Sequence, residues 1–215
     1  MLIEIFSDVV CPWCYIGKRR FEAALAEVAD EIGDVTVVYR PFQLDPGAPS
    51  EPEPVLTAYA AKFGGEQQAL SLMANVSRVA AGEGLEFHLD DAQRVNTLDA
   101  HRVLMWTLRT YGPSAQQVVK ESLLRAYFTD GGNIADRAVL AAAVRDAGLD
   151  PAPLDAMLDG DDLRDDVAAE LSDAHRRGVS AVPTYVFDDN WAISGAQDQA
   201  LFAQALRTLS ARAAT

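Results

Sequence analysis

The chain is poor in cysteine and in basic residues, and it has no long uncharged apolar run. Its 215 residues include 2 cysteines, 18 basic residues and 32 acidic residues, so the formal net charge is −14. A strongly acidic surface repels phosphate groups, which disfavours binding to nucleic acids or docking on an anionic membrane. No apolar stretch approaches the roughly 20 residues that span a bilayer. We therefore predict a protein that binds neither nucleic acid nor membrane.

The first ten residues also lack the pattern of a secretory signal. Glu4 and Asp8 interrupt this stretch, and no basic segment precedes them. A cytoplasmic location is the resulting expectation. Hydrophobic residues make up 49% of the chain and charged residues 23%, which is typical of a globular protein with a sizeable core.

The two cysteines, Cys11 and Cys14, are too close in sequence to cross-link a chain of this length. In a reducing compartment, a lone Cys-x-x-Cys motif indicates catalysis or metal binding. A structural zinc site needs four ligands, and the only histidines are His88, His101 and His175, with no second cysteine pair. We therefore predict no metal and favour redox chemistry over zinc binding or a pair of inert core thiols.

Both ends of the chain have strand character. Residues 2–6 and 35–39 are short apolar runs, and a helical pattern of apolar residues lies between them. This order predicts a βαβ unit with parallel strands. Near the other end, residues 184–187 and 191–193 flank a polar turn and predict a hairpin, which a helix over residues 197–211 follows.

The middle of the chain has helical periodicity from a proline-rich linker at residues 46–54 to about residue 177. Ser114 followed by Gln117 matches a capping box at the start of one helix. Helices are expected to begin after Pro54, Gly65, Asn96, Pro113, Asp136, Pro151 and Asp161. We predict an α/β fold in which residues 1–45 and 178–215 form one discontinuous domain and residues 46–177 form an all-helical insertion domain.

The motif Cys11-Pro12-Trp13-Cys14 follows the first strand, with Pro12 suited to the first position of a helix. Cys11 is then the N-cap, and its sulfur is expected to face the free N–H groups of Trp13 and Cys14. This position and the helix dipole should lower the pKa of Cys11 and make it the nucleophile. The spacing of three places both thiols within disulfide reach, so Cys14, predicted to be less exposed, would resolve mixed disulfides. This chemistry needs no cofactor.

Residues 6–17, FSDVVCPWCYIG, resemble the active-site region of DsbA-like thioredoxin-fold oxidoreductases, and most of all the cytoplasmic FrnE subgroup with its CPWC motif. The resemblance continues through residues 40–44, RPFQL, residues 96–101, NTLDAH, and residues 178–184, GVSAVPT. It implies a thioredoxin-like fold, βαβ…ββα, that a large helical insertion interrupts.

The resemblance also implies that the Val182–Pro183 bond is cis and lies beside the redox pair. Val182 would then offer its backbone N–H and C=O to an extended substrate; the alternative is an ordinary trans proline that opens an edge strand. His101 is a further candidate: it either lines a cleft near Cys11 or is a partly buried histidine of a capped helix.

Two departures from related families bear on function. Some FrnE-type proteins carry another cysteine pair, which this chain lacks, so electrons must be exchanged with an external thiol reductant or oxidant. Kappa-class glutathione transferases and 2-hydroxychromene-2-carboxylate isomerases resemble this fold but carry serine at the position of Cys11. The presence of Cys11 and Cys14 therefore favours thiol–disulfide exchange with protein or small-molecule disulfides or dithiols.

Two other functions stay open. One is a glutathione-linked isomerase or transferase, with glutathione as co-substrate, and the other is a peptide-binding or holdase module. The protein is expected to be a monomer or a homodimer.

Overall fold

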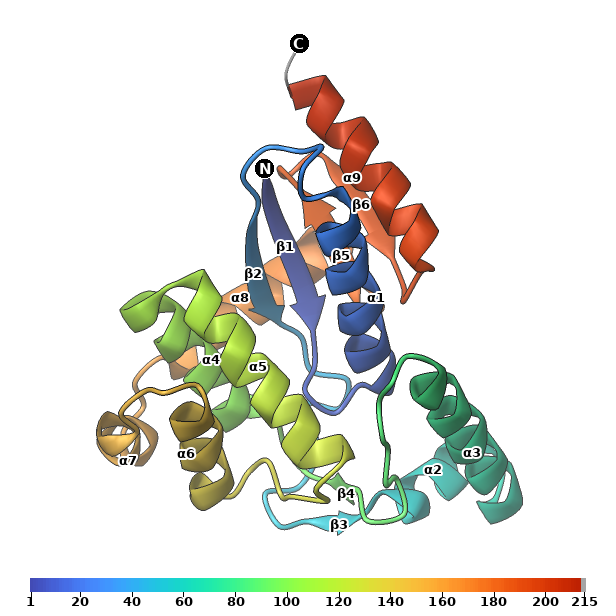
Figure 1. The fold of residues 1–215 in the computed structure, drawn as a ribbon. Helices are drawn as coiled ribbons and strands as arrows, with labels where there is room; N and C mark the ends of the chain where they lie inside the picture. Colours follow the sequence, from blue (N-terminus) through green and yellow to red (C-terminus); the bar gives the residue numbers. More distant parts are fainter. Residues whose placement is uncertain (214–215) are drawn as a thin grey trace.

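A mixed four-stranded sheet lies at the centre of the fold, seen in a computed structural model that describes residues 1–213 (Figure 1). In the order β2-β1-β5-β6, β1 pairs in parallel with β2 and antiparallel with β5, and β5 pairs antiparallel with β6. The predicted parallel pair and hairpin are therefore confirmed. The strands are β1 (Leu2–Ser7), β2 (Thr36–Pro41), β5 (Thr184–Phe187) and β6 (Trp191–Ser194).

Two helices cover one face of this sheet. α1 (Pro12–Val28) and α9 (Gln199–Ala213) pack against each other beside β1 and β5. The ring of Phe21 lies 5.0 Å from that of Tyr185 and 5.3 Å from that of Phe202, centroid to centroid. These buried aromatic rings join both ends of the chain into one core, because burying such rings dominates core energetics.

The helical segment contacts the sheet at its edge strand β2, through α4 (Leu98–Tyr111), α5 (Pro113–Phe128) and α8 (Arg164–Arg176). Buried Gln116 on α5 accepts a hydrogen bond from Tyr39 N at 2.8 Å and donates to Tyr39 O at 2.9 Å. Its amide therefore occupies the free backbone edge of β2 as a further strand would. This pairing fixes α5 against the sheet.

The remaining helices begin where the sequence predicts them. They are α2 (Val55–Phe63), α3 (Glu66–Gly82), α6 (Arg137–Asp146) and α7 (Ala152–Asp159). In Figure 1, α2 and α3 extend away from the other helices as an arm. None of the helices within residues 1–213 is long and apolar enough to cross a membrane.

Two details of the prediction are wrong. The segment is not all-helical, because β3 (Glu53–Pro54) and β4 (Gln93–Arg94) form a short antiparallel pair. The capping box at Ser114 is absent, because α5 already begins at Pro113 and its N-cap is Gly112.

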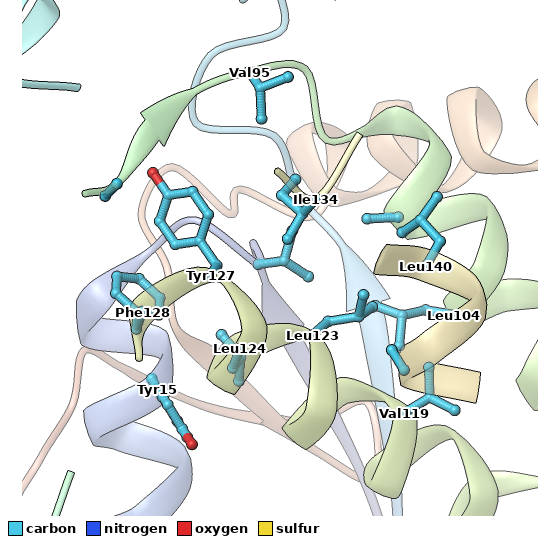
Figure 2. Close-up of a cluster of buried hydrophobic side chains, with 14 of the residues drawn as sticks. Tyr15, Val95, Leu104, Val119, Leu123, Leu124, Tyr127, Phe128, Ile134 and Leu140 are labelled. Atoms are coloured by element: carbon cyan, nitrogen blue, oxygen red, sulfur yellow. The ribbon is translucent and has the colours of Figure 1, made fainter. Parts of the chain in front are cut away.

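The core of the helical segment reaches into the first helix of the sheet domain. Leu123, Leu124 and Phe128 of α5 form part of its centre, and Tyr15 of α1 enters it from the side (Figure 2). The Tyr15 ring lies 5.8 Å from Phe87 and 6.0 Å from Phe128, centroid to centroid. The domain boundaries at residues 45 and 178 stay a prediction, and this shared core shows that the two parts pack as neighbours directly behind the cysteine motif.

Candidate active site

The cysteine motif lies where β1 gives way to α1. Cys11 is the N-cap of α1, Pro12 is its first residue, and Cys14 N donates a hydrogen bond to Cys11 O at 3.0 Å. The predicted helix register is therefore confirmed. Both thiols are free and each residue is 3% exposed, so the expectation that Cys14 is the less exposed one is wrong. Trp13 projects from the motif and is 42% exposed.

The Cys11 sulfur contacts a loop that is distant in sequence. Its Sγ lies 3.7 Å from Val182 O, and the Val182–Pro183 bond is cis, as the resemblance implied. Cys11 makes no side-chain cap hydrogen bond of standard geometry, but the backbone N–H of Cys14 acts on its sulfur and lowers its pKa, in the direction expected of a helix start. Val182 is partly buried and Pro183 is buried.

Gly17 allows α1 to approach this loop. A Cβ at Gly17 would lie 2.6 Å from Tyr185 Oη, 3.0 Å from Pro183 Cγ and 3.2 Å from Ala196 Cβ. Real Cβ atoms essentially never show a contact as short as 2.6 Å, and the other two distances are unusually tight, so a side chain would displace the helix from the loop. The absence of a side chain at Gly17 therefore places Cys11 beside Val182.

The two thiols titrate as a coupled pair, so the charge of one affects the pKa of the other. The pKa of Cys11 is raised well above its ordinary value, first by its hydrogen bond with Cys14 and then by burial. Burial acts in the same direction on Cys14, but the hydrogen bond from Cys11 and the charge of Lys120 outweigh it, so the pKa of Cys14 is lowered. The expectation of a lowered pKa at Cys11 is therefore wrong for the reduced pair.

A groove with a volume of about 920 Å³ opens beside Cys11. At one end it is lined by Cys11, Trp13 and Val182. Its walls are mainly apolar and come from the α2–α3 arm and from the segments around β3 and β4. Its volume lies at the upper end of the range for ligand sites, about 300–1,000 Å³. The groove could not be found from the sequence, because it depends on where the arm lies in space.

His101 lies on the other side of the motif and does not line this groove. Its side chain is buried, with Nε2 3.2 Å from Asp8 Oδ1 and 3.1 Å from Phe42 O. Because both neighbours are acceptors, we assign the proton to Nε2. Asp8 also accepts hydrogen bonds from the N–H groups of Val9 and Leu44, at 2.8 Å each. Of the two interpretations of His101, the structure matches the buried core histidine, which here holds Asp8 just before the cysteines.

Lys120 is a charged residue near the pair that the sequence analysis missed. It lies on α5, is 0% exposed, and its Nζ has no hydrogen-bond partner among the described residues. Burial lowers its pKa to about 8, although the negative charges of Cys14 and Asp8 oppose this change. Its position between Val119 and Leu123, on the apolar face of the helix, was the available sequence signal.

Within residues 1–213, no three histidine, cysteine or acidic side chains are grouped so as to hold a metal ion. The site therefore consists of the two thiols, the Val182 backbone, the groove, and the buried polar groups behind Cys14.

The sheet order, with α1 and α9 on one face, is that of a thioredoxin-like fold, and the helices between β2 and β5 are a large insertion into it. With a Cys-x-x-Cys motif at the N-terminus of α1, the chain has the architecture of thioredoxin-fold oxidoreductases. The DsbA-like thioredoxin domain model matches residues 2–207, and the chain belongs to that family.

Three known proteins illustrate the similarity. The crystal structure of the probable DsbA oxidoreductase SCO1869 from Streptomyces coelicolor is 36% identical, with a TM-score of 0.87 over 97% of this chain and 89% of that one. The uncharacterized protein YwbO of Bacillus subtilis is 24% identical over 95% of this chain and 94% of its own length. The cytosolic disulfide reductase DsbM from Pseudomonas aeruginosa, solved with glutathione, is 20% identical with a TM-score of 0.66 over the whole of both chains.

Proposed function

We propose that the protein is a thiol–disulfide oxidoreductase of the FrnE type that uses Cys11 and Cys14 to exchange disulfides with protein or small-molecule substrates. The observation that carries the proposal is the position of Cys11, which lines an open groove beside the Val182 backbone at the start of α1. The reaction needs no cofactor, and an external thiol couple restores the pair. A cytoplasmic location is part of the proposal, and the cytosolic DsbM is compatible with it.

In the reductive direction, the Cys11 thiolate attacks one sulfur of a substrate disulfide and the other sulfur leaves as a thiolate. Cys14 then attacks the Cys11 sulfur, which releases the second substrate thiolate and leaves a Cys11–Cys14 disulfide. The hydrogen bond between the thiols supports the first step, because moving the Cys11 proton onto Cys14 creates the Cys11 thiolate. Oxidation of a substrate dithiol is the reverse sequence.

Substrate positioning falls to the loop beside Cys11. The Val182 carbonyl lies next to the reacting sulfur, where an extended peptide can pair with the backbone of Val182. Pro183 follows Val182 in this loop, and Pro12 and Trp13 line the groove between and beside the two cysteines. These residues support the reaction without taking part in the exchange of bonds.

Reduction of insulin by dithiothreitol tests this proposal. We expect the wild-type protein to accelerate the reaction and Cys11→Ser to abolish that acceleration, because no other thiol faces the groove. Activity retained in Cys11→Ser would refute the assignment.

Glutathione is a candidate co-substrate, and the solved complex of DsbM with glutathione, which has the same fold, supports it. A glutathione-linked isomerase or transferase would saturate with glutathione and would keep its turnover in Cys14→Ala. Disulfide exchange through both thiols predicts the opposite result for that variant.

A further inference from the structure

The buried charged groups around the cysteine pair nearly all have partners. Glu4 bonds with Arg40 at 2.6 Å and with Arg177 at 2.9 Å, and Lys18 bonds with Glu22 at 2.7 Å. These pairs neutralise one another and have no free capacity for a proton. Asp8 is similarly engaged by two backbone N–H groups and by His101.

Lys120 is the exception among the buried charged side chains of residues 1–213. Its Nζ has no hydrogen-bond partner and lies 5.5 Å from the centroid of the Tyr39 ring. A lone buried ammonium group is costly, so a lysine there is unfavourable for folding unless a negative charge compensates for it. The thiolate of Cys14 attracts Lys120 and is one such charge.

A small cavity lies beside Lys120. Its volume is about 10 Å³, close to the space that one water needs, and Ser7 and Lys120 both line it. Ser7 lies beside Cys14 and favours its thiolate, and its hydroxyl, like Lys120 Nζ, has an unused hydrogen-bond capacity. A water in the cavity would join the Ser7 hydroxyl to the lysine.

Several titratable groups face Lys120. They are Cys14 and Lys18 from α1, Cys11 at its N-cap, Asp8 from the turn before it, Tyr39 and Arg40 from β2, His101 from α4 and Glu170 from α8. Arg40 pairs with Glu170 at 2.9 Å, and His101 bonds with Asp8. Cys11, which lines the groove, and Cys14 are therefore the groups of this set whose charge changes during the exchange reaction. Of the two, Cys14 is the one that does not line the groove, so its charge is left for Lys120 to balance.

We propose that Lys120 is a positioning residue of the redox pair: its amino group takes up the proton that Cys14 releases during resolution, and as an ammonium it stabilises the Cys14 thiolate. The inference rests on the proposed thiol–disulfide exchange and adds that the helical insertion supplies the group that controls the proton of Cys14.

The bonds and charges balance in the resolving step. In the mixed disulfide Cys14 carries a proton, so the negative charge that opposes the lowering of the Lys120 pKa is gone, and Lys120 releases its proton to solvent. The S–H bond of Cys14 then breaks and its proton moves to the neutral amine of Lys120, through Ser7 and the cavity. The Cys14 sulfur bonds to the Cys11 sulfur, the bond from Cys11 to the substrate sulfur breaks, and the substrate leaves as a thiolate. The substrate disulfide gains the two electrons that the cysteine pair loses. In the oxidative direction, the ammonium returns the proton to Cys14.

The test measures the thiolate of the reduced protein by ultraviolet absorbance across pH, together with the rate at which a Cys11 mixed disulfide is resolved. In Lys120→Met, we expect the apparent pKa of the first thiolate to rise by about one unit and resolution at pH 7 to slow by about tenfold. Lys120→Arg keeps the charge but cannot act as a base, so it should keep the thiolate pKa of the wild type and still resolve slowly.

The control is Arg145→Met, which removes an exposed positive charge in the last turn of α6 and should leave the thiolate pKa unchanged. If Lys120→Met matches the wild type in both measurements, or if Arg145→Met changes the thiolate pKa equally, Lys120 does not have this role. Those results leave the Cys11→Ser test untouched, so the two proposals can fail separately.

Discussion

The two thiols are three residues apart, but their surroundings differ. Cys11 lines an apolar groove of about 920 Å³, whereas Ser7, which lies beside Cys14, lines a small cavity of about 10 Å³ together with His101 and Lys120. The groove is large enough for a substrate, whereas the small cavity has room for about one water molecule. The difference indicates a division of work, in which the α2–α3 arm contacts substrate and α4 and α5 control charge.

The groove and the cavity both depend on how the helical insertion, and α5 in particular, is held against α1. Glu121 on α5 accepts hydrogen bonds from Tyr15 at 2.8 Å and Arg19 at 2.7 Å, and its other oxygen binds Lys18. Burial alone would raise the pKa of Glu121, but Lys18 and these bonds lower it. The cluster ties the residue next to Lys120 to the helix that carries both cysteines.

The comparison predicts its largest effect for Cys14→Ala. We expect insulin reduction to fall at least a hundredfold, because the mixed disulfide on Cys11 then has no internal thiol to resolve it. Mass spectrometry without reductant should show a substrate bound to Cys11 in Cys14→Ala and none in Cys11→Ala. Turnover within a few-fold of the wild type would instead favour glutathione-linked chemistry.

Gly17→Ala should push α1, which carries the cysteine motif, away from the loop that contains Val182 and Pro183. The added methyl group would meet Tyr185 Oη and Pro183 Cγ at distances shorter than contact, so we expect a loss of about 2–3 kcal/mol in the free energy of unfolding. Gly33→Ala is the matched control, because a Cβ there meets nothing within 4 Å. Urea titrations of both variants measure this effect, and an equal stability of the two would mean that the α1 contact with the loop is loose.

Lys120→Met should make the protein more stable at pH 7, by on the order of 1–3 kcal/mol. The pKa of Lys120 falls from its usual 10.5 to about 8, which corresponds to at most about 3 kcal/mol. A lowered lysine pKa means that the unfolded chain binds more protons between these values, so wild-type stability rises with pH from about 8 to 10.5. The advantage of the variant should therefore shrink over that range.

Denaturant titrations at several pH values check this expectation, with Lys62→Met as the control, because that lysine side chain is exposed. A Lys120→Met protein that is clearly less stable than the wild type at pH 7 would mean that the ammonium is well compensated in the folded state.

The features that the sequence predicted correctly are those set by residues close to one another in the chain, such as the starts of helices. Pro12 after Cys11 placed the motif at a helix start, and prolines, Gly65 or Asp136 marked the starts of five of the seven inserted helices, because such residues act on the backbone within one turn. The other two starts, expected after Asn96 and Asp161, fall one and two residues later than predicted. The two-residue strands at Glu53 and Gln93 carry no periodicity that could reveal them. The capping box at Ser114 was misplaced because Pro113 itself begins the helix.

Features that depend on distant contacts were not predictable from the sequence. The charge of Cys14 depends on Lys120, more than a hundred residues away, and the pKa order of the thiols follows from their coupling rather than from the helix dipole alone. His101 lies in a matching family motif, but its neighbours Asp8 and Phe42 come from other elements. A lysine among apolar residues of a helix is a signal worth following in such chains.

The smallest predicted effect tests whether the groove that Cys11 lines binds the substrate. Leu72 and Leu70 lie on the same helix and are 46% and 47% exposed, but only Leu72 lines the groove. If the groove binds polypeptides, Leu72→Ser should raise the KM for insulin about three- to tenfold and leave kcat unchanged, because about 1 kcal/mol of apolar contact is lost in binding. Leu70→Ser should change neither value, and a small disulfide that reaches only Cys11 should react equally with both variants. Equal KM values for insulin would exclude the α3 side of the groove and assign recognition to the end beside Cys11, where Val182 and Trp13 lie.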